Sequence, residues 1–349
     1  MKKAVLFCEN PYSFGILQPI AEVFKQRKTA YIWYVKTSIV TAFPFKNEAF
    51  TSDIHEIERF KSDAIFVPGN EVPYYVRGVK TQVFHGLAGE KKGHFRIRDY
   101  FDLYLTQGPF FTQRFQELQE QKKDFTVIET GWPKLDVYGK EAHKYEAEKK
   151  EILAANKATK IVLYAPTFSP SLTSAPYLLE EIKRLASNKA YVILIKFHDL
   201  MAQEQIDAYR KLAAEVENIH FESEKNIIKY LLISDLMISD TSSVVYEFLL
   251  LDKPVLTFKN FSKNIQWEDI KEYTGLSEKV ENIFQKDLFK EKRRAIFRDY
   301  HPFNDGRSAE RMVDAVDQFI EKNGVPEFRK LSFLRRFKIH KIFGKPERN

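Results

Sequence analysis

The chain has 349 residues, which is too long for one ordinary hydrophobic core and about right for two domains of typical size. With 44% hydrophobic and 30% charged residues it can bury a core in each domain, so disorder is excluded for most of its length. It has 13 glycines and one cysteine, Cys8. The sequence contains no G-x-G-x-x-G or G-x-x-x-x-G-K-[ST] motif, which excludes the usual dinucleotide and P-loop sites. It also contains no H-E-x-x-H, G-x-S-x-G or C-x-x-C motif, which excludes the corresponding zinc and serine-hydrolase sites, and a single cysteine excludes an intramolecular disulfide.

Short apolar segments alternate with helical ones along the chain, as in parallel βαβ units. In the first half we predict strands at residues 4–8, 30–35, 64–67, 82–84, 103–106 and 126–129. In the second half we predict them at residues 160–164, 192–197, 220–222, 236–239 and 255–258. Residues 138–160, rich in Glu, Lys and Ala, read as a helical or linking stretch. The pattern predicts an α/β fold with two Rossmann-like, doubly wound lobes, residues 1–145 and 146–325.

The net charge of +7 is concentrated in residues 326–349, which carry eight Lys or Arg and two Glu. The rest of the chain is nearly neutral, so a nucleic-acid-binding surface on the lobes is not expected. The tail is also rich in Phe, Leu and Ile, in an imperfect amphipathic pattern from which Phe333 and Phe337 stray. One interpretation is a basic amphipathic tail that lies on an anionic membrane surface. The other is a last helix packed on the body, and both remain open.

The first apolar stretch, residues 4–8, is too short for a signal peptide, and no stretch approaches 18 uninterrupted apolar residues. We therefore expect no membrane span. The predicted location is the cytoplasm, peripherally at the inner face of the cell membrane.

In open parallel sheets, ligands bind at the carboxyl ends of the strands, so the residues just after each strand are candidates for a site. His85 follows a first-lobe strand and precedes Gly86. A neutral imidazole there can accept a proton from an attacking hydroxyl. Lys91 and Lys92 lie close by in sequence and could hold phosphate oxygens. The alternative is a loop-bonded histidine beside solvated lysines.

A second candidate is the hydroxyl-rich segment that follows a predicted strand of the later lobe, with Asp240, Thr241, Ser242 and Ser243. An apolar helix comes next, so unpaired backbone N–H groups and hydroxyls would face the same point and could cradle a phosphate. Plain capping of that helix by Asp240, Thr241 or Ser242 is equally compatible with the sequence.

Lys196 and His198 end another strand of the later lobe. Strand alternation predicts that they share one side and clamp a diphosphate or protonate its leaving group; the alternative is a strand-end pair facing water. Arg311, in a helix after a turn, is a candidate phosphate contact or a surface arginine. No D-x-D triplet occurs. We therefore expect phosphate binding without a metal, and no cofactor.

Taken in order, several segments resemble the CDP-glycerol glycerophosphotransferase family, which includes teichoic-acid primases and polymerases and their capsule relatives. The similar segments span roughly residues 80 to 315, and only their order makes the resemblance specific. They are His85-Gly86 with the following lysines, residues 130–136 (TGWPKLD), 164–167 (YAPT), 196–198 (KFH), 233–235 with 239–243 (ISD, SDTSS) and 305–311 (DGRSAER).

The resemblance implies a GT-B-like pair of lobes, with a CDP-alcohol donor in the C-terminal lobe and a polyol or polyol-phosphate acceptor near the N-terminal one. It implies that His85 is the base or another catalytic residue on the acceptor side, and that His198 is a catalytic residue contacting the donor phosphates. It also implies that Asp240, Ser242 and Ser243 form part of the CDP site and that Arg311 lies near the same phosphates. Together with the residues proposed from the motifs, the predicted substrate-binding residues are Lys91, Lys92, Thr167, Lys196, Asp240, Thr241, Ser242, Ser243 and Arg311.

Three departures concern the substrate more than the reaction class. The loop after Gly86 runs through residues 87–90 (LAGE) where the family usually has Thr-Pro, Thr241 stands where an aromatic residue is common, and Glu247 stands where Asp is common.

These observations predict a transferase in which an acceptor hydroxyl, deprotonated with help from His85, attacks the β-phosphorus of a CDP-activated polyol and expels CMP. The predicted acceptor is a cell-surface glycan or a lipid-linked molecule. One alternative is a GT-B glycosyltransferase that uses a nucleotide sugar, because a diphosphate site reads alike for both donors. Another is a catalytically idle, membrane-associated scaffold.

Overall fold

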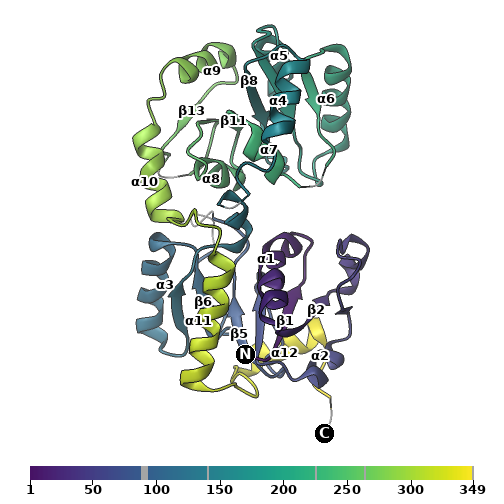
Figure 1. Ribbon diagram of the computed structural model, residues 1–349, viewed down its shortest axis with the longest axis vertical. Helices are drawn as coiled ribbons and strands as arrows, with labels where there is room; N and C mark the ends of the chain where they lie inside the picture. Colours follow the sequence, from purple (N-terminus) through teal and green to yellow (C-terminus); the bar gives the residue numbers. More distant parts are fainter. Residues whose placement is uncertain (88–92, 140, 225, 263–264, 348–349) are drawn as a thin grey trace. The chain divides into compact units, whose positions relative to one another are not determined.

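A computed structural model describes residues 1–349 except 88–92, 140, 225, 263–264 and 348–349 (Figure 1). The chain forms two compact units. Unit 1 comprises residues 1–140 together with 299–349, and unit 2 comprises residues 141–298. Each unit is a parallel sheet with helices on its faces, as the alternation of strands and helices predicts.

The sheet of unit 1 has seven strands in the order β3-β2-β1-β4-β5-β6-β7, and every neighbouring pair is parallel. The first connections run from the middle of the sheet to one edge and the later ones to the other, which is the doubly wound arrangement. The strands are β1 (Lys3–Cys8), β2 (Ala30–Val35), β3 (Phe50–Thr51), β4 (Ala64–Val67), β5 (Val79–Gln82), β6 (Leu103–Thr106) and β7 (Thr126–Glu129).

Helices cover both faces of this sheet. The helices α1 (Tyr12–Arg27) and α11 (Ser308–Asn323) contact each other and the 3-10 helix η2 (Pro133–Tyr138). The other face carries a core cluster with side chains from α2 (Ile54–Phe60), α3 (Pro109–Lys122) and α12 (Phe333–Phe343). A further 3-10 helix, η1 (Thr37–Ala42), follows β2. Because alternate side chains of a strand point to opposite faces, Val5 and Phe7 of β1 join this cluster.

The sheet of unit 2 has six strands in the order β10-β9-β8-β11-β12-β13, again all parallel. The strands are β8 (Lys160–Tyr164), β9 (Tyr191–Ile195), β10 (Ile219–Phe221), β11 (Leu236–Ser239), β12 (Val255–Phe258) and β13 (Glu268–Ile270). The helices are α4 (Glu146–Ala155), α5 (Ala175–Leu185), α6 (Gln203–Glu215), α7 (Ile228–Ile233), α8 (Val244–Leu249), α9 (Leu276–Gln285) and α10 (Lys290–Tyr300).

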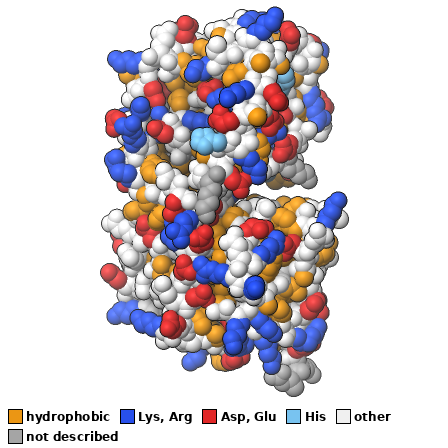
Figure 2. Space-filling model, in the orientation of Figure 1, with side chains coloured by type: hydrophobic (Ala, Val, Ile, Leu, Met, Phe, Trp, Pro, Cys, Tyr) orange, Lys and Arg blue, Asp and Glu red, His pale blue; other side chains and the backbone are white. Residues whose placement is uncertain are grey.

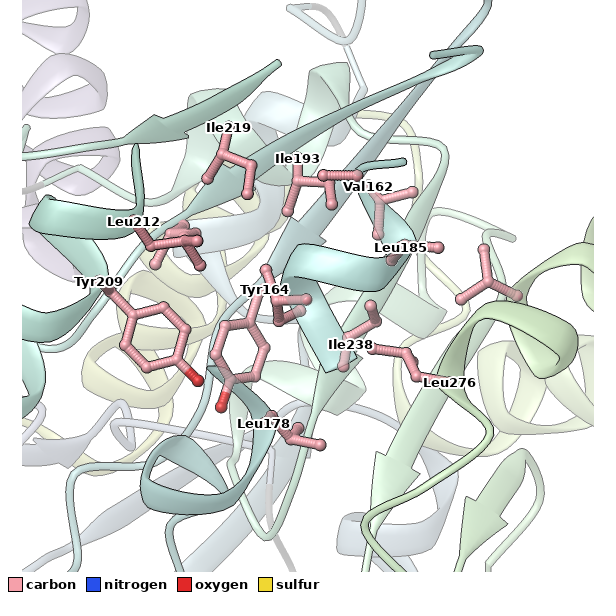
Figure 3. Close-up of a cluster of buried hydrophobic side chains, with 14 of the residues drawn as sticks. Val162, Tyr164, Leu178, Leu185, Ile193, Tyr209, Leu212, Ile219, Ile238 and Leu276 are labelled. Atoms are coloured by element: carbon pink, nitrogen blue, oxygen red, sulfur yellow. The ribbon is translucent and has the colours of Figure 1, made fainter. Parts of the chain in front are cut away.

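One face of the unit 2 sheet packs against α5, α6 and α9 (Figure 3). Figure 3 shows Tyr164 of β8 beside Tyr209 of α6, with Leu178 of α5 nearby. The Tyr164 and Tyr209 ring centroids are 5.6 Å apart. Strands β8, β9 and β11 are neighbours in this sheet and pair in parallel. The candidate residues of this unit directly follow the carboxyl ends of these strands.

The structure corrects the predicted division of the chain. Residues 299–325 were expected in the second lobe, but they belong to unit 1. The α-amino group of Met1 lies 2.7 Å from Asp317 Oδ1, and Arg27 of α1 lies 2.7 Å from Asp314 Oδ1. Met312 and Val316 of α11 are buried. An amphipathic helix pattern shows that a face is buried but not on which sheet, so the sequence left the assignment of α11 undetermined.

The basic tail also belongs to unit 1 and is not a free extension. Leu331, Ile339 and Phe343 are buried in the core cluster that contains Phe7. Arg329 Nη1 lies 2.7 Å from Asp102 Oδ1, and Nη2 lies 3.0 Å from Asp124 Oδ2. The tail therefore ends in a helix packed on the body, which was one of the two interpretations.

A second apolar stripe on the same helix is exposed. Phe333, Leu334 and Phe337 have 80%, 78% and 64% of their surface accessible. Phe333 and Phe337 are the positions that stray from the amphipathic pattern of the tail, because α12 has one apolar face in the core cluster and another facing outward. Elsewhere, Figure 2 shows Lys and Arg side chains intermixed with Asp and Glu over the visible face of each unit.

Candidate functional site

His85 stands three residues beyond the end of β5, directly after Phe84, which has a left-handed φ of 66°. Its Nδ1 atom lies 2.8 Å from the carbonyl oxygen of Pro68. A carbonyl can only accept, so Nδ1 must carry a proton and donate it. In the neutral ring Nε2 is then the unprotonated nitrogen, which is the form a general base needs. His85 is exposed, as expected for a residue projecting from the loop.

The loop after β4 that orients His85 is itself fixed. The Nε2 amide of Gln82 lies 3.2, 3.3 and 2.9 Å from the carbonyl oxygens of Val67, Pro68 and Gly69. Gln82 is buried, so these contacts replace the water that the amide would otherwise bind. The imidazole also stacks on Tyr12, with the ring centroids 5.1 Å apart. Neither Gln82 nor Tyr12 was singled out by the sequence.

The histidine of unit 2 has the opposite hydrogen-bond pattern. His198 follows β9 and is exposed, and its Nδ1 atom accepts from the backbone N–H of Leu200 at 3.1 Å. Because a backbone N–H can only donate, Nδ1 is unprotonated and Nε2 carries the proton. Partial burial lowers the pKa of His198, which favours this neutral ring. His198 thus presents an N–H donor, and its ring lies 4.4 Å from that of Phe168.

Lys196 does not pair with His198 as predicted. Strand β9 ends at Ile195, so alternation does not extend to residues 196–198. The Lys196 side chain is buried, and its Nζ donates to the carbonyl of Phe197 at 2.7 Å. Burial lowers its pKa, while Asp199 and Glu222 raise it. Lys196 places a buried positive charge under the end of β9, and the predicted two-sided clamp by Lys196 and His198 is wrong.

Asp240 holds together the loop that follows β8. Its Oδ1 accepts from the backbone N–H of Thr167 at 2.8 Å. Its Oδ2 accepts from the backbone N–H and the hydroxyl of Ser174, at 2.8 and 2.9 Å. Asp240 is fully buried, and burial raises its pKa to about 6 despite these donors. Its carboxylate is occupied by donors of the chain, so Asp240 positions residues 167–174 and the structure does not support the predicted direct contact with CDP.

The hydroxyl residues after Asp240 are half-buried and lie between β11 and the six-residue helix α8. Thr241 Oγ1 accepts from the backbone N–H of Phe261 at 3.3 Å. Ser243 is the N-cap residue and has a helical backbone (φ −69°, ψ −20°), and within the described structure its side chain makes no capping hydrogen bond. The capping interpretation is wrong for Asp240, whose carboxylate instead accepts from the backbone N–H groups of Thr167 and Ser174. Ser242 and Ser243 stay candidates for binding phosphate.

Arg311 belongs to unit 1, whereas Ser242 and Ser243 belong to unit 2. Its guanidinium donates to the carbonyl of Thr130 at 2.8 Å and to Asp305 Oδ2 at 2.7 Å, and it lies 4.2 Å from the Phe303 ring centroid. These contacts are structural. They correct the prediction that Arg311 belongs to the donor lobe, while its contact with the donor phosphates stays a prediction.

The segment at residues 130–136 is the partner of α11. The Asp136 carboxylate accepts from the backbone N–H groups of Ser308 and Ala309, both at 2.8 Å, and so caps the first turn of α11. The buried His301 accepts at Nε2 from the backbone N–H of Trp132 at 2.9 Å, and burial lowers its pKa to about 4. Residues 130–136 and 305–311, two of the segments that carry the resemblance, thus contact each other and stabilise the start of α11.

Within unit 2 the structure brings several predicted residues to the carboxyl ends of neighbouring strands β9, β8 and β11. They are Lys196, His198, Thr167, Asp240, Thr241, Ser242 and Ser243. His85 occupies the corresponding edge of unit 1. Lys91 and Lys92 lie outside the described residues. None of the described helices is both long enough and apolar enough to cross a bilayer.

A profile of the family described as CDP-glycerol:poly(glycerophosphate) glycerophosphotransferase matches residues 78–318, more than half of the chain. The chain belongs to this family. The matched range includes His85, His198 and residues 239–243, so the resemblance inferred from the order of the motifs is confirmed.

Curated members of the family align over part of the chain. The teichoic acid poly(glycerol phosphate) polymerase of Bacillus spizizenii is 29% identical over 178 residues, which cover 48% of this chain and 43% of that protein. The teichoic acid ribitol-phosphate polymerase TarL of Staphylococcus aureus is 26% identical over 300 residues, covering 72% of this chain and 51% of TarL. The chain thus spans about half the length of these relatives.

Solved structures show the fold. The wall teichoic acid polymerase TagF superposes with a TM-score of 0.67 at 18% identity, covering 92% of this chain and 89% of that one. The S. aureus MnaA–UDP structure gives 0.66 at 14% identity, with 92% and 97% covered. The predicted GT-B architecture of two Rossmann-like lobes is confirmed.

Proposed function

We propose that this family member transfers a polyol-phosphate unit, glycerol phosphate or ribitol phosphate, from a CDP-activated donor to a hydroxyl of a cell-surface glycan or lipid-linked acceptor. The acceptor oxygen forms a bond to the β-phosphorus. The bond between that phosphorus and the oxygen bridging it to CMP breaks, and CMP leaves with the electron pair. The observation that carries the proposal is the protonation state that Pro68 imposes on His85 in a member of this family.

His85 acts as the base in this proposal. With Nδ1–H bound to the Pro68 carbonyl, the ring takes the proton of the acceptor hydroxyl on Nε2 as the new O–P bond forms. The hydrogen bond to Pro68 also stabilises the imidazolium that results, because the carbonyl keeps accepting from Nδ1. Base catalysis of this kind contributes about 10²- to 10⁴-fold in rate.

The donor diphosphate binds at the carboxyl edge of the unit 2 sheet. His198 Nε2–H and the hydroxyls of Ser242 and Ser243 donate to its oxygens, and Thr167 and Thr241 lie at the same edge. The buried charge of Lys196 adds a positive potential. Donors already oriented toward developing negative charge lower a barrier by several kcal/mol.

The test is CMP release by the purified chain with a lipid-linked or glycan acceptor, with and without added divalent metal. We expect release with CDP-glycerol or CDP-ribitol and none with UDP-sugars. Transfer from a nucleotide sugar instead of either CDP-polyol would replace the proposal by the glycosyltransferase alternative. No turnover with any donor, together with no donor-induced rise in melting temperature, would contradict both.

We also propose that the exposed stripe of α12, formed by Phe333, Leu334 and Phe337, lies on an anionic membrane surface, which would hold the enzyme at the inner face of the cell membrane. The stripe is exposed, and it is accompanied by the exposed cations Lys330, Arg336, Lys341 and Lys345. Apolar side chains inserted among headgroups and cations facing anionic lipid favour the same orientation. The chemical complement of this mixed surface is a lipid bilayer with negative headgroups.

Vesicle binding tests this placement. We expect binding to phosphatidylglycerol-containing vesicles that weakens with salt, and at least a tenfold loss for the Phe333→Ser/Phe337→Ser double variant. Leu288→Ser, which changes a 69% exposed residue of unit 2, is the matched control and should bind as the unmodified chain does. Equal binding to phosphatidylcholine vesicles, or an unaffected double variant, would contradict the proposal.

A further inference from the structure

Glu9 is a charged residue at the edge of unit 1 that the sequence did not single out. It directly follows β1, which lies next to β4, and β4 lies next to β5. His85 follows β5. Glu9 and His85 therefore flank the loop after β4 at the carboxyl edge, on strands two places apart, or roughly 10 Å at the usual strand spacing.

The loop between them holds both side chains. The Pro68 carbonyl accepts from His85, and the backbone N–H of Glu71 donates to the Glu9 carboxylate. Gly69 makes room for that carboxylate, because a Cβ at this position would lie 2.6 Å from Glu9 Oε2. The Glu9 carboxylate and the base are thus set at fixed positions by the same four residues of loop.

The surroundings of Glu9 do not explain why a carboxylate is there. The Glu71 carboxylate repels it, and the cations that face it are Lys36 after β2 and Lys338 of α12, of which Lys338 is paired with Glu71 at 2.6 Å. The facing phenols are Tyr12 and Tyr34, whose pKa values are both raised. Burial, with Glu71 as the next cause, raises the pKa of Glu9 to about 7. A glutamine could accept the same backbone hydrogen bond without this cost.

We propose that the Glu9 carboxylate binds a second hydroxyl of the acceptor, next to the hydroxyl that His85 deprotonates. The inference rests on the proposed transferase function and names the acceptor class, a polyol with neighbouring hydroxyl groups. The lone pairs of a carboxylate accept hydrogen bonds from such hydroxyls, and two fixed contacts orient the attacking oxygen.

The test compares two small acceptors, glycerol 3-phosphate carried on an octyl ester and the 2-deoxy analogue of that ester, with Glu9→Gln and Glu22→Gln variants. Glu22 is an exposed glutamate of α1 and serves as the matched control. We expect the 2-deoxy acceptor to have at least a tenfold higher KM than the diol on the unmodified chain. Glu9→Gln should raise the KM for the diol by a similar factor, leave that for the 2-deoxy acceptor unchanged, and leave CDP-glycerol binding unchanged.

Ionisation gives a second readout. Diol binding by the unmodified chain should strengthen as the pH rises through about 7, where the Glu9 carboxyl ionises, and this step should be absent in Glu9→Gln. An unchanged KM for the diol in Glu9→Gln, or an equal loss for both acceptors, would overturn the inference. Calorimetric binding of the two acceptors without donor gives the same comparison if no CMP is released, so failure of the transferase proposal is distinguishable.

Discussion

The two units place a histidine at the same kind of position and give it opposite chemistry. His85 and His198 both follow a strand of a parallel sheet. A backbone carbonyl fixes the proton of His85 on Nδ1, and a backbone N–H keeps Nδ1 of His198 unprotonated. One ring is therefore set as a base and the other as a donor. The local backbone partner, rather than residue type or distance from the strand, therefore decides what each histidine can do.

Replacing each histidine by glutamine separates the two roles. Glutamine has an N–H donor at its end but no basic nitrogen. We expect His85→Gln to lower kcat by about 10²- to 10⁴-fold, because no group takes the acceptor proton. His198→Gln should lose about tenfold or less, because the amide can replace Nε2–H, whereas His198→Ala should lose about 10²-fold. Initial rates of CMP release at saturating donor measure these losses.

Donor affinity is the control for this comparison. His85→Gln should bind CDP-glycerol as the unmodified chain does, and His198→Ala should bind it more weakly. Equal losses in kcat for His85→Gln and His198→Gln would contradict the assignment of opposite roles.

The two units also contrast in the carboxyl groups whose pKa values are raised. Asp240 of unit 2 accepts three hydrogen bonds from Thr167 and Ser174, and its pKa is raised to about 6. Glu9 of unit 1 accepts from one backbone N–H beside another carboxylate, and its pKa is raised to about 7. Asp240 therefore has a structural role, because its carboxylate binds donors of the chain. The Glu9 carboxylate accepts fewer hydrogen bonds from the chain and can accept further ones from a ligand.

This contrast predicts a pH dependence of stability. A carboxyl whose pKa is raised on folding binds more protons in the folded state, so its contribution to stability falls as the pH rises from its unfolded pKa to its folded one. For Glu9 this window runs from 4.5 to about 7. Relative to the unmodified chain, Glu9→Gln should therefore gain up to about 3 kcal/mol in unfolding free energy between these pH values.

Urea unfolding of both chains across this pH range measures the difference. Glu22→Gln, at an exposed site, should show no such trend. If the difference in unfolding free energy between Glu9→Gln and the unmodified chain did not change with pH, the pKa of the Glu9 carboxyl would not be raised by burial.

The architecture could be predicted from the sequence, because the periodicity of apolar residues and the order of strands and helices along the chain indicate the fold class. Apolar runs at strand length, separated by helices, identified eleven of the strands approximately. The strands that were missed, Phe50–Thr51 and Glu268–Ile270, have two and three residues and lie at sheet edges, where burial leaves little pattern. The strand Val79–Gln82 was predicted too late in the chain, and it contains Lys80, a charged residue that is fully buried.

The site was predictable in its residue types more than in its contacts. His85 and His198 follow strands, so the carboxyl-edge rule found them. Glu9 follows the first strand too, but nothing in the sequence shows that Gly69 and Glu71 from another connection surround it. The assignment of Arg311 to the second lobe was wrong for a related reason. Which sheet receives α11 depends on tertiary contacts such as Asp136 with Ser308, which pair residues far apart in the chain.

Arg311 offers the smallest and most specific test of the division between structural and functional cations. If its role is to hold α11 to the 130–136 segment, Arg311→Lys should lose the fork that reaches Thr130 and Asp305 together while keeping the charge. We expect a loss of about 1 kcal/mol in unfolding free energy.

Donor kinetics distinguish this role from the phosphate contact that the sequence suggested. The KM for CDP-glycerol should change by less than about twofold in Arg311→Lys, because the guanidinium is engaged by protein groups within unit 1. A phosphate-binding arginine would behave differently, since losing its paired N–H donors weakens donor binding at unchanged stability. A tenfold rise in the KM for CDP-glycerol with no change in the urea midpoint would therefore contradict the structural role and show that Arg311 binds the donor.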